Sequence, residues 1–549
     1  MKTLCFAVLA ALAVASPLTA DEPQAHQHQH SGTPPEKLGV VHFPVSCSEE
    51  AQRRFARATA LLHSFWYDEA AKAYADVLAA DPSCGMAHWG VAMSYYHPIW
   101  APPAPDELSK GSQAAQRAKA AAPAMKTERE RAYVAAVAAF YDGAQSADHR
   151  TRALRFEKAL EAVARDHPGD HEAAVFHALA LLGTALPTDK TYANQKKAAA
   201  ILTKVLPDEP EHPGVAHLII HSYDYPELAE LGLDAARAYA KIAPSSPHAL
   251  HMPSHIFTRL GLWDESIASN LASAASAKAH VEKTLPGAAS FDQLHALDYL
   301  EYAHLQEGDD ARARAVLEQV SAAQKFDLPN FAAAYCLAAV PARYALERRS
   351  WKEAAALTVR PAGFPWKTFP YAEAIVHFAR SMGAARSGDV AAARQALARL
   401  DAIHRVLQAS KDVYWAGQVD IQRKAAAGWI AHAGGKDDEA LALLRSASEL
   451  EDKTDKHPVT PGPVLPAREQ LGDLLLELGK PAEALKEYEA SNRISPNRFN
   501  GLLGAGRSAE KAGDAAKARE LYGKLVVLGS VAQGGRPVLA EAQAYLGRR

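Results

Sequence analysis

Stretches rich in alanine and leucine alternate with short turns that contain glycine, proline and charged residues, from about residue 51 to the end of the chain. β-Branched residues are sparse in most of these stretches, which favours helices over strands. A chain of 549 residues is also too long to form one ordinary hydrophobic core. The pattern therefore predicts an all-α protein of helical hairpins, built as several domains or as one elongated array.

The hairpins repeat most clearly near the C-terminus, where two copies start at Leu465 and Phe499. Small residues stand at positions 8, 15 and 20 of each copy and a tyrosine at position 24: Gly472, Gly479, Ala484 and Tyr488 in the first, and Gly506, Gly513, Ala518 and Tyr522 in the second. The small residues allow the two helices of a hairpin to approach closely, and the aromatic ring fills the groove that they leave. A period of ~34 residues with this pattern is typical of the tetratricopeptide repeat.

Through these two copies the chain resembles tetratricopeptide-repeat (TPR) proteins, and weaker copies start at Ala51 and near Ala216. The resemblance implies an all-α, TPR-like solenoid of helical hairpins that winds as a right-handed superhelix. The N-terminal half also resembles a group of exported bacterial TPR proteins, in the motifs LLHSFWYDEA, DPSCGMAHWG, AHLIIHSYD and HALHMPSHIFTRLGLWDES. That group is a sequence pattern without an assigned activity, so the resemblance implies an architecture and no catalytic residue.

Residues 1–20 have the organisation of a cleavable secretory signal. Lys2 supplies the positive start, residues 6–14 form the apolar stretch, and the predicted cut follows Ala20. An N-terminal membrane anchor is the alternative, but the apolar stretch is well short of the ~20 residues that span a bilayer. We therefore expect a periplasmic or secreted protein, in which no later segment is long and apolar enough to span a membrane.

The composition of the rest of the chain predicts four segments: a lead-in, a long array, a linker and a C-terminal pair of repeats. Residues 21–42 are polar and contain histidine and proline, which predicts a flexible lead-in. Residues 43–452 are expected to form a long TPR-like array with a histidine-lined groove, and residues 467–549 a C-terminal TPR pair. Between these two parts, the proline-rich residues 453–466 are expected to form a linker.

Charge and cysteine content narrow the chemistry further. Charged residues make up 22% of the chain and the formal net charge is -3, without the clustered basic excess of a nucleic-acid-binding protein. We therefore expect no nucleic-acid partner.

Export permits disulfides, so Cys47 and Cys84, which flank the first repeat, can pair with each other. Two buried free thiols are the alternative.

The 24 histidines are unevenly placed, and three consecutive predicted hairpins hold several of them. The TPR resemblance implies that positions 2, 5, 6, 9, 12 and 13 of each hairpin line the concave face of the solenoid. Phasing from Ala216 and from the turn glycines Gly261 and Gly308 puts the following residues at such positions: His217 and His221; His248, His251 and His255; and His295, Asp298 and Tyr302. His177 can belong to the same groove from the preceding hairpin.

The spacing of these histidines suits a metal site. His217 and His221 are four residues apart on one helix face, as are His251 and His255, so each pair can share a metal ion. Packed helices lie ~8–10 Å apart, so imidazoles from adjacent helices can converge, and five or six of them allow a two-metal site. Imidazole ligands suit transition metals such as zinc, copper or iron. The carboxylate of Asp298 can be a further ligand or can orient a histidine.

Pro253 lies between His251 and His255 and complicates this prediction. Ser246 and Pro247 form a good N-cap and first-turn pair, so a helix is expected to start there and to contain Pro253 in its interior. An interior proline removes a backbone hydrogen bond and kinks the helix. The kink can re-aim the histidines that precede it, or it can spoil their shared face.

Several functions fit these residues. The first is a scaffold whose concave groove binds a transition metal, a protein or peptide partner, or both. The second is a metal-dependent enzyme, either a hydrolase or an oxidase, that uses the same histidine cluster. The third is metal storage or delivery. The sequence has no HEXXH protease motif and no evident GxSxG elbow, so it points to no catalytic residue and leaves open whether the protein is an enzyme.

Overall fold

The computed structural model describes residues 36–532 and 536–548. The predicted signal sequence and most of the predicted lead-in lie outside these residues. The chain divides into two units, Met1–Glu36 and Lys37–Arg549, and all the helices that the structure describes belong to the second unit. In this described part of the chain, no helix is long and apolar enough to cross a membrane.

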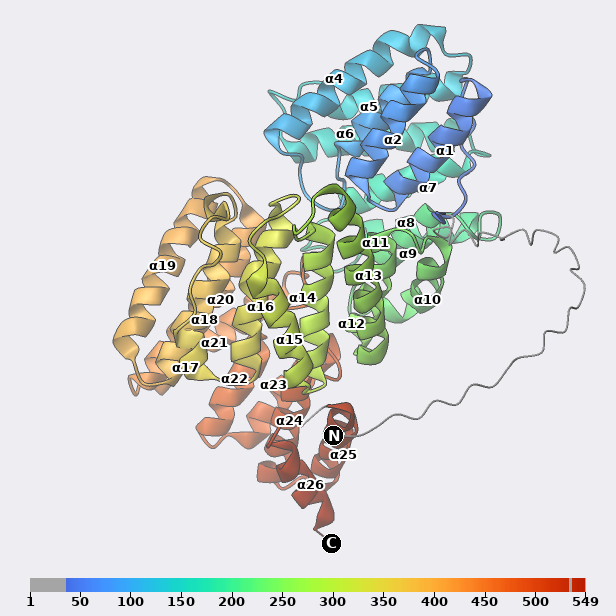
Figure 1. Ribbon diagram of the computed structural model, residues 1–549. Helices are drawn as coiled ribbons and strands as arrows, with labels where there is room; N and C mark the ends of the chain where they lie inside the picture. Colours follow the sequence, from blue (N-terminus) through green and yellow to red (C-terminus); the bar gives the residue numbers. More distant parts are fainter. Residues whose placement is uncertain (1–35, 533–535, 549) are drawn as a thin grey trace, which may run out of the picture. The chain divides into compact units, whose positions relative to one another are not determined.

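The first half of the second unit is a succession of α-helices (Figure 1). The helices are α1 (Glu49–His63), α2 (Tyr67–Ala80), α3 (Gly85–Ser94), α4 (Pro105–Ala121), α5 (Glu128–Tyr141), α6 (His149–Asp166), α7 (His171–Gly183), α8 (Ala193–Val205), α9 (Pro213–Tyr223), α10 (Leu233–Ile242), α11 (Pro247–His251) and α12 (Pro253–Leu260), with the 3₁₀ helices η1 (Ala122–Ala124) and η2 (Ala229–Gly232). Several begin at a side chain that accepts a backbone N–H of the first turn, such as Ser48, Thr127 and Asp148. Such N-caps fix where a helix starts.

The second half continues in the same way. The helices are α13 (Trp263–Thr284), α14 (Phe291–Gln306), α15 (Asp310–Ala322), α16 (Phe331–Glu347), α17 (Trp351–Ala355), α18 (Pro370–Arg386), α19 (Val390–Ala409), α20 (Val413–Ala433), α21 (Asp437–Asp452), α22 (Ala467–Glu477), α23 (Pro481–Ile494), α24 (Phe499–Ala512), α25 (Ala515–Leu528) and α26 (Leu539–Gly547), with η3 (Trp366–Thr368) and η4 (Gly529–Val531). Gly261 and Gly513 end α12 and α24 in the left-handed conformation that glycine adopts without strain.

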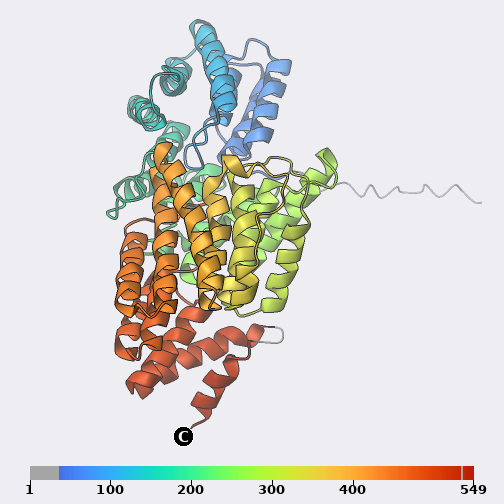
Figure 2. The ribbon, with the colours of Figure 1, turned by 90° about the vertical axis from the view of Figure 1, so that its left-hand side faces the viewer.

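Each helix packs mainly against the helices that precede and follow it in the chain, as in stacked hairpins. Figures 1 and 2 show the helices between about residues 250 and 450 standing side by side. Segments far apart in the sequence also meet, since α9 contacts α1 and α24 contacts α14. Among the described residues no strand forms apart from an isolated bridge between Ala289 and Phe326. The prediction of an all-α, TPR-like solenoid is confirmed.

The small residues of the repeat signature lie against aromatic rings. A Cβ atom added at Gly472 would lie 2.7 Å from the ring of Tyr488, and one added at Gly506 would lie 2.7 Å from the ring of Tyr522. Both tyrosines are fully buried. These contacts leave no room for a side chain at either glycine, which is how the paired helices approach so closely.

The structure differs from the predicted lead-in at its C-terminal end. Residues 37–42 belong to the compact second unit, in which Leu38, Val41 and the following Phe43 are buried. The ring of Phe43 packs edge-on against Trp89, with 5.5 Å between centroids. Burial of these apolar side chains stabilises the segment, although its neighbours in the sequence are polar.

The structure also differs from the predicted linker at residues 453–466. This segment packs into the second unit and buries Val459 and Val464. The Oη of Tyr299 donates to the carbonyl oxygen of Pro458 at 2.9 Å. Its prolines keep the segment from forming a helix, but the segment contributes side chains to the interior.

Cys47 and Cys84 form a disulfide, with their Cα atoms 5.1 Å apart. The bridge ties the segment before α1 to the start of α3. Cys336 is a buried free thiol.

Candidate metal centre

Six histidines meet in the interior of the solenoid: His217 and His221 of α9, His248 and His251 of α11, His255 of α12 and His295 of α14. We call these six residues the histidine centre. These helices bring the six histidines close to one another, since α12 contacts α9 and α11 contacts α14 (Figure 1). The six side chains are between 0 and 5% exposed. The centre as a whole is therefore enclosed by the protein and is not a groove that a peptide could occupy.

The helix that was predicted to run through Pro253 is broken at Met252. α11 ends at His251 and α12 begins at Pro253, because proline has no N–H to donate to the preceding turn. The rings of His251 and His255 nevertheless lie 5.0 Å apart, centroid to centroid. The proline therefore does not spoil the face that these two histidines share.

The first group of the centre consists of His217, His221 and His248, which can each bring one nitrogen within 4.8 Å of the others. The Nε2 atom of each ring is buried and has no hydrogen-bond partner among the described residues. The Nδ1–H of His217 donates to the backbone oxygen of His63 at 2.6 Å, which leaves the Nε2 lone pair free. Buried nitrogens without partners are costly, and a metal ion is one ligand that satisfies three of them at once.

The second group consists of His251, His255 and His295, which can also each bring one nitrogen within 4.8 Å of the others. His251 Nδ1 lies 2.7 Å from Asn270 Oδ1, and His255 Nδ1 lies 2.9 Å from Asp224 Oδ2. Both acceptors are oxygens, so both Nδ1 atoms carry the proton. Neither nitrogen of His295 has a hydrogen-bond partner among the residues that the structure describes.

The Nε2 atoms of His251 and His255 lie 3.0 Å apart. Because the protons of these neutral rings are on Nδ1, neither Nε2 can donate to the other, and two lone pairs face each other. Metal–nitrogen bonds of ~2.0–2.1 Å at ordinary coordination angles place ligand nitrogens roughly 3 Å apart. The spacing therefore fits a pair of imidazoles that share a metal ion.

Asp224 and Asn270 hold these rings in place. Asp224 Oδ1 accepts from Arg259 Nε at 2.8 Å, and its Oδ2 also accepts from Lys456 Nζ at 3.1 Å. Burial raises the pKa of Asp224, but Lys456 and Arg259 together bring it well below its ordinary value. Asn270 Nδ2 donates to the backbone oxygen of Ser266 at 2.7 Å, which turns Oδ1 toward the histidine. Outer groups of this kind commonly orient metal-ligating histidines.

The two groups are neighbours. The rings of His221 and His255 lie 6.0 Å apart, and those of His248 and His251 lie 6.1 Å apart. The ring of Tyr299 packs against the second group, 4.7 Å from His251 and 5.0 Å from His255. Two metal ions held by these groups would therefore share one buried centre.

Burial lowers the pKa of every histidine in the centre, and in His217 the pKa falls to about 3. The rings are therefore neutral at pH 7, which is the form that binds metal ions. Six neutral ligands add no charge of their own, so a bound metal ion would keep its positive charge.

Asp298 and Tyr302 follow His295 on α14 but do not join the centre. Arg343 Nη1 donates to Asp298 Oδ1 at 2.8 Å, and Arg498 Nη1 donates to Tyr302 Oη at 2.7 Å. Seven residues advance a helix by ~10.5 Å, so Tyr302 lies beyond the rings that His295 contacts. Asp298 follows His295 by three residues, about 60° around the helix, and its carboxylate pairs with Arg343 of α16 instead of reaching the imidazoles.

His177 also lies outside the centre. It forms a separate group with Glu157 and Glu161 of α6, and its Nε2 is 3.6 Å from Glu157 Oε1. α7 packs against α6, and His177 faces that helix. Glu161 is exposed, so this group lies at the surface.

A further buried cluster, which the sequence did not predict, is centred on Glu172 of α7. His63 Nε2 lies 2.9 Å from Glu172 Oε2, and His212 Nε2 lies 2.8 Å from Oε1. Burial raises the pKa of Glu172, but the two histidines bring it below its ordinary value. We call these three residues the Glu172 triad. Each Nε2 in it has a carboxylate partner.

Sequence reasoning missed four groups that surround the centre: Asp224, Asn270, Tyr299 and Lys456. Asp224 directly follows α9 and ends the AHLIIHSYD motif, so that motif contained a signal. Lys456 reaches Asp224 from 232 residues further along the chain. Its position depends on packing that no local pattern reveals.

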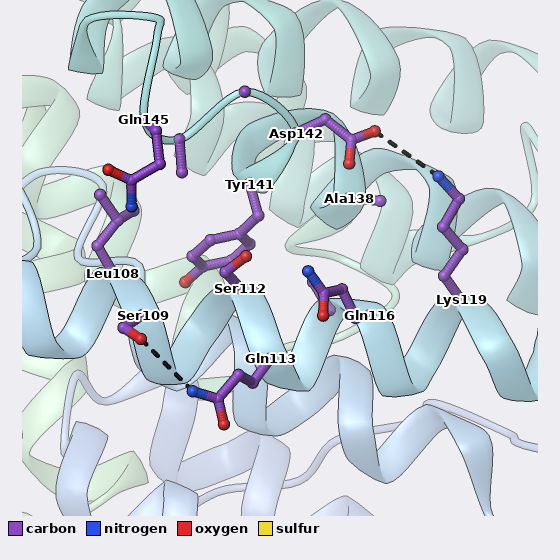
Figure 3. A pocket seen from close by; sticks show the side chains of 13 residues that line it. Leu108, Ser109, Ser112, Gln113, Gln116, Lys119, Ala138, Tyr141, Asp142 and Gln145 are labelled. Carbon is purple, nitrogen blue, oxygen red and sulfur yellow. Dashed lines mark hydrogen bonds and ion pairs between the residues drawn. The ribbon is translucent and has the colours of Figure 1, made fainter.

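A separate hollow of about 410 Å³ lies between α4 and α5 (Figure 3). Four of its polar groups pair with one another, since Gln113 donates to Ser109 at 3.4 Å and Lys119 lies 3.8 Å from Asp142. No residue of the histidine centre lines this hollow. We therefore assign it no part in the centre.

No protein-family model matches the chain, and no curated protein matches its sequence. Among solved structures, the chain is similar to the human IFIT1 dimer with PPP-AAAA, at 12% identity over 81% of this chain and 91% of that chain, with a TM-score of 0.37. It is also similar to yeast Tom70, at 12% identity over 90% and 96% of the two chains, with a TM-score of 0.32. The APC/C hetero-tetramer Cut9-Hcn1 matches at 13% identity over 91% and 76%, with a TM-score of 0.33.

Proposed function

We propose that this protein is an exported helical-repeat metalloprotein whose histidine centre binds two transition-metal ions, one in each group of three histidines. The orientation of the rings is the observation that carries the proposal. The outer Nδ1 atoms of His217, His251 and His255 donate to oxygens, and the Nε2 atoms are left without hydrogen-bond donors. Two of those Nε2 atoms lie 3.0 Å apart. Metal binding removes their mutual repulsion.

The ligand set favours copper or zinc. Both groups consist of imidazoles alone, without a thiolate or a carboxylate. Imidazole nitrogens suit zinc, copper and iron, but mononuclear non-haem iron sites of enzymes commonly add a carboxylate ligand. Copper(II) also binds more tightly than the other divalent ions of its row at such sites.

Three protein ligands per ion favour catalysis over a purely structural role. Structural zinc sites are usually closed by four protein ligands, whereas catalytic sites keep one position for water or substrate. We therefore propose a metal-dependent enzyme, a hydrolase or an oxidase, ahead of metal storage. A protein or peptide partner stays a prediction of the TPR resemblance, at a surface other than these buried histidines.

Elemental analysis of untagged protein, after gel filtration, tests the proposal. We expect two ions of copper or zinc per chain, and about one fewer in each of His217→Ala and His255→Ala because each substitution opens one three-ligand group. His304→Ala is the matched control. His304 is also buried on α14 but belongs to neither group, so its replacement should leave the metal content unchanged.

The proposal fails if the purified protein holds no metal and takes up neither copper nor zinc on titration. It also fails if His217→Ala, His255→Ala and His304→Ala all retain the same metal content.

A further inference from the structure

A cavity of about 550 Å³ reaches the histidine centre at His221. This volume lies within the range of roughly 300–1,000 Å³ that small-molecule sites occupy. The cavity is bounded by the end of α7 and the loop after it, by the end of α9, by the start of α20 and by residues 455–458. It is therefore a route by which a small molecule could reach one face of the centre.

Apolar side chains form much of the cavity wall: Ile99, Pro102, Leu182, Leu186, Pro187 and Val413. Polar groups gather where the cavity meets the centre: His221, Asp224, Lys456 and His457. His457 Nδ1 accepts from the backbone N–H of Val459 at 3.1 Å, so the proton of its neutral ring is on Nε2. The cavity thus combines an apolar body with one polar end.

The charges of the protein around this polar end nearly balance. Asp224 is paired with Lys456 at 3.1 Å and with Arg259 at 2.8 Å. Asp455 is paired with Lys190 at 2.9 Å. Without a metal ion, the cavity therefore has no strong preference for an anion.

Metal ions change this balance. Two divalent ions add four positive charges at the centre, and the neutral imidazoles offset none of them. The interior is shielded from water, so an unbalanced charge there attracts an anion strongly. The occupied centre therefore favours an anionic ligand.

His221 connects the centre to the cavity. It lines the cavity, and its Nε2 has no hydrogen-bond partner among the described residues. An ion bound by His221, His217 and His248 keeps a coordination position that the protein does not fill. A ligand in the cavity can fill it.

We propose that this cavity binds a small organic anion, a carboxylate or phenolate on an apolar body, whose oxygen coordinates the ion of the first group. The proposal rests on the proposed function, because the metal ion supplies the charge that selects an anion. The apolar walls hold the body of the ligand, and Lys456 and the ring N–H of His457 add positive or donor groups beside its oxygen.

Benzoate is the probe, and benzyl alcohol and benzylamine are its neutral and cationic analogues. In copper-loaded protein we expect benzoate to shift the visible absorption of copper saturably and both analogues to leave it unchanged. Metal-free protein should bind benzoate at least about tenfold more weakly in calorimetry, because it lacks the attracting charge.

Two exposed leucines provide a matched pair of variants. Leu186 lines the cavity and is 47% exposed, whereas Leu231 lies outside it and is 63% exposed. Leu186→Asp should weaken benzoate binding about threefold to tenfold, because a carboxylate at the wall repels the anion. Leu231→Asp should not change it. Both positions face solvent, so neither variant should impair folding.

The outcomes separate the two proposals. Protein that binds two metal ions but shows no copper response to benzoate, or an equal response to benzyl alcohol, overturns this inference and leaves the metal centre standing. Equal benzoate affinity in the Leu186 and Leu231 variants also overturns it. Protein that binds no metal overturns both proposals.

Discussion

The protein buries two kinds of histidine cluster that differ in where their protons point. In the Glu172 triad, the Nε2 atoms of His63 and His212 meet carboxylate oxygens at 2.9 and 2.8 Å. In the histidine centre, His217 and His255 donate outward from Nδ1. The Nε2 of His217 has no hydrogen-bond partner among the described residues, and the Nε2 of His255 lies 3.0 Å from that of His251. The same residue type, buried to the same degree, thus has carboxylate partners in one region and nitrogens without donor partners in the other; the triad also has the spacing of a metal site, but its Nε2 atoms are already paired.

One residue links the two regions. His63 binds Glu172 through its ring and accepts the Nδ1–H of His217 through its backbone oxygen. The Glu172 triad therefore fixes the end of α1, and the end of α1 orients a histidine of the centre. The following predictions test the contrast between a cluster that needs no metal and one that does.

Removal of the carboxylate of the triad should have the largest effect. Glu172→Ala leaves two buried imidazoles without their partner, and we expect the free energy of unfolding of metal-free protein to fall by about 3–5 kcal/mol. Denaturant titration measures it. Glu161→Ala, at an exposed glutamate, should change little. Unchanged stability in Glu172→Ala would show that the triad is not a structural cluster.

Metal binding should stabilise the protein through the centre alone. At a free metal concentration 100 times the Kd, we expect each bound ion to add about 2.7 kcal/mol to the free energy of unfolding. A chelator should reverse the gain, and His251→Ala should reduce it. If the gain in His251→Ala equals that of the parent protein, the metal binds elsewhere.

The outer carboxylate should tune metal affinity. Asp224→Asn keeps the shape of the side chain but removes the charge that faces His255, so we expect metal affinity to fall by about 10- to 100-fold. Competition with a chelator of known affinity measures this change. Asp298→Asn is the control, because Asp298 binds Arg343 instead of a histidine. Equal metal affinities in the two variants would show that Asp224 does not support metal binding by the centre.

Acid should destabilise the metal-free protein through the buried histidines. Burial lowers the pKa of His217 from 6.5 to about 3. Because the folded pKa is the lower one, the contribution of this residue is complete above pH 6.5 and is lost as the pH falls toward 3. Each such histidine contributes a slope of about 1.4 kcal/mol per pH unit within this window. His217→Gln should reduce the slope in denaturant titrations, and an unchanged slope would contradict a neutral buried ring.

The sequence predicted the repeat, and the repeat pattern assigned six histidines to the same face of the solenoid. The signature residues of a repeat contact each other within one hairpin, as Gly472 does with Tyr488 and Gly506 with Tyr522. Their spacing along the sequence is therefore enough to predict these contacts. The phase of a helix then follows from its turn glycine, which is how the second and third hairpins were assigned to the same face as the hairpin phased from Ala216.

The surroundings of the centre could not be predicted in this way. Asp298 was expected beside the histidines, but its carboxylate pairs with Arg343 of α16, a partner on another helix that the repeat phase does not reveal. Asn270 and Lys456 come from α13 and from a segment without a repeat pattern. Their positions depend on how helices pack against one another, which a single sequence does not encode locally.

Residues 455–460 pack beside the histidine centre but are synthesised long after its histidines. All six histidines are translated by residue 295, but Tyr299 donates to the backbone oxygens of Pro458 and Thr460, and Lys456 reaches Asp224. A nascent chain thus contains all six histidines long before it contains residues 455–460, which pack over one side of the centre. A chain cut short before residue 455 would leave this side of the centre facing water, even though none of its histidines were missing.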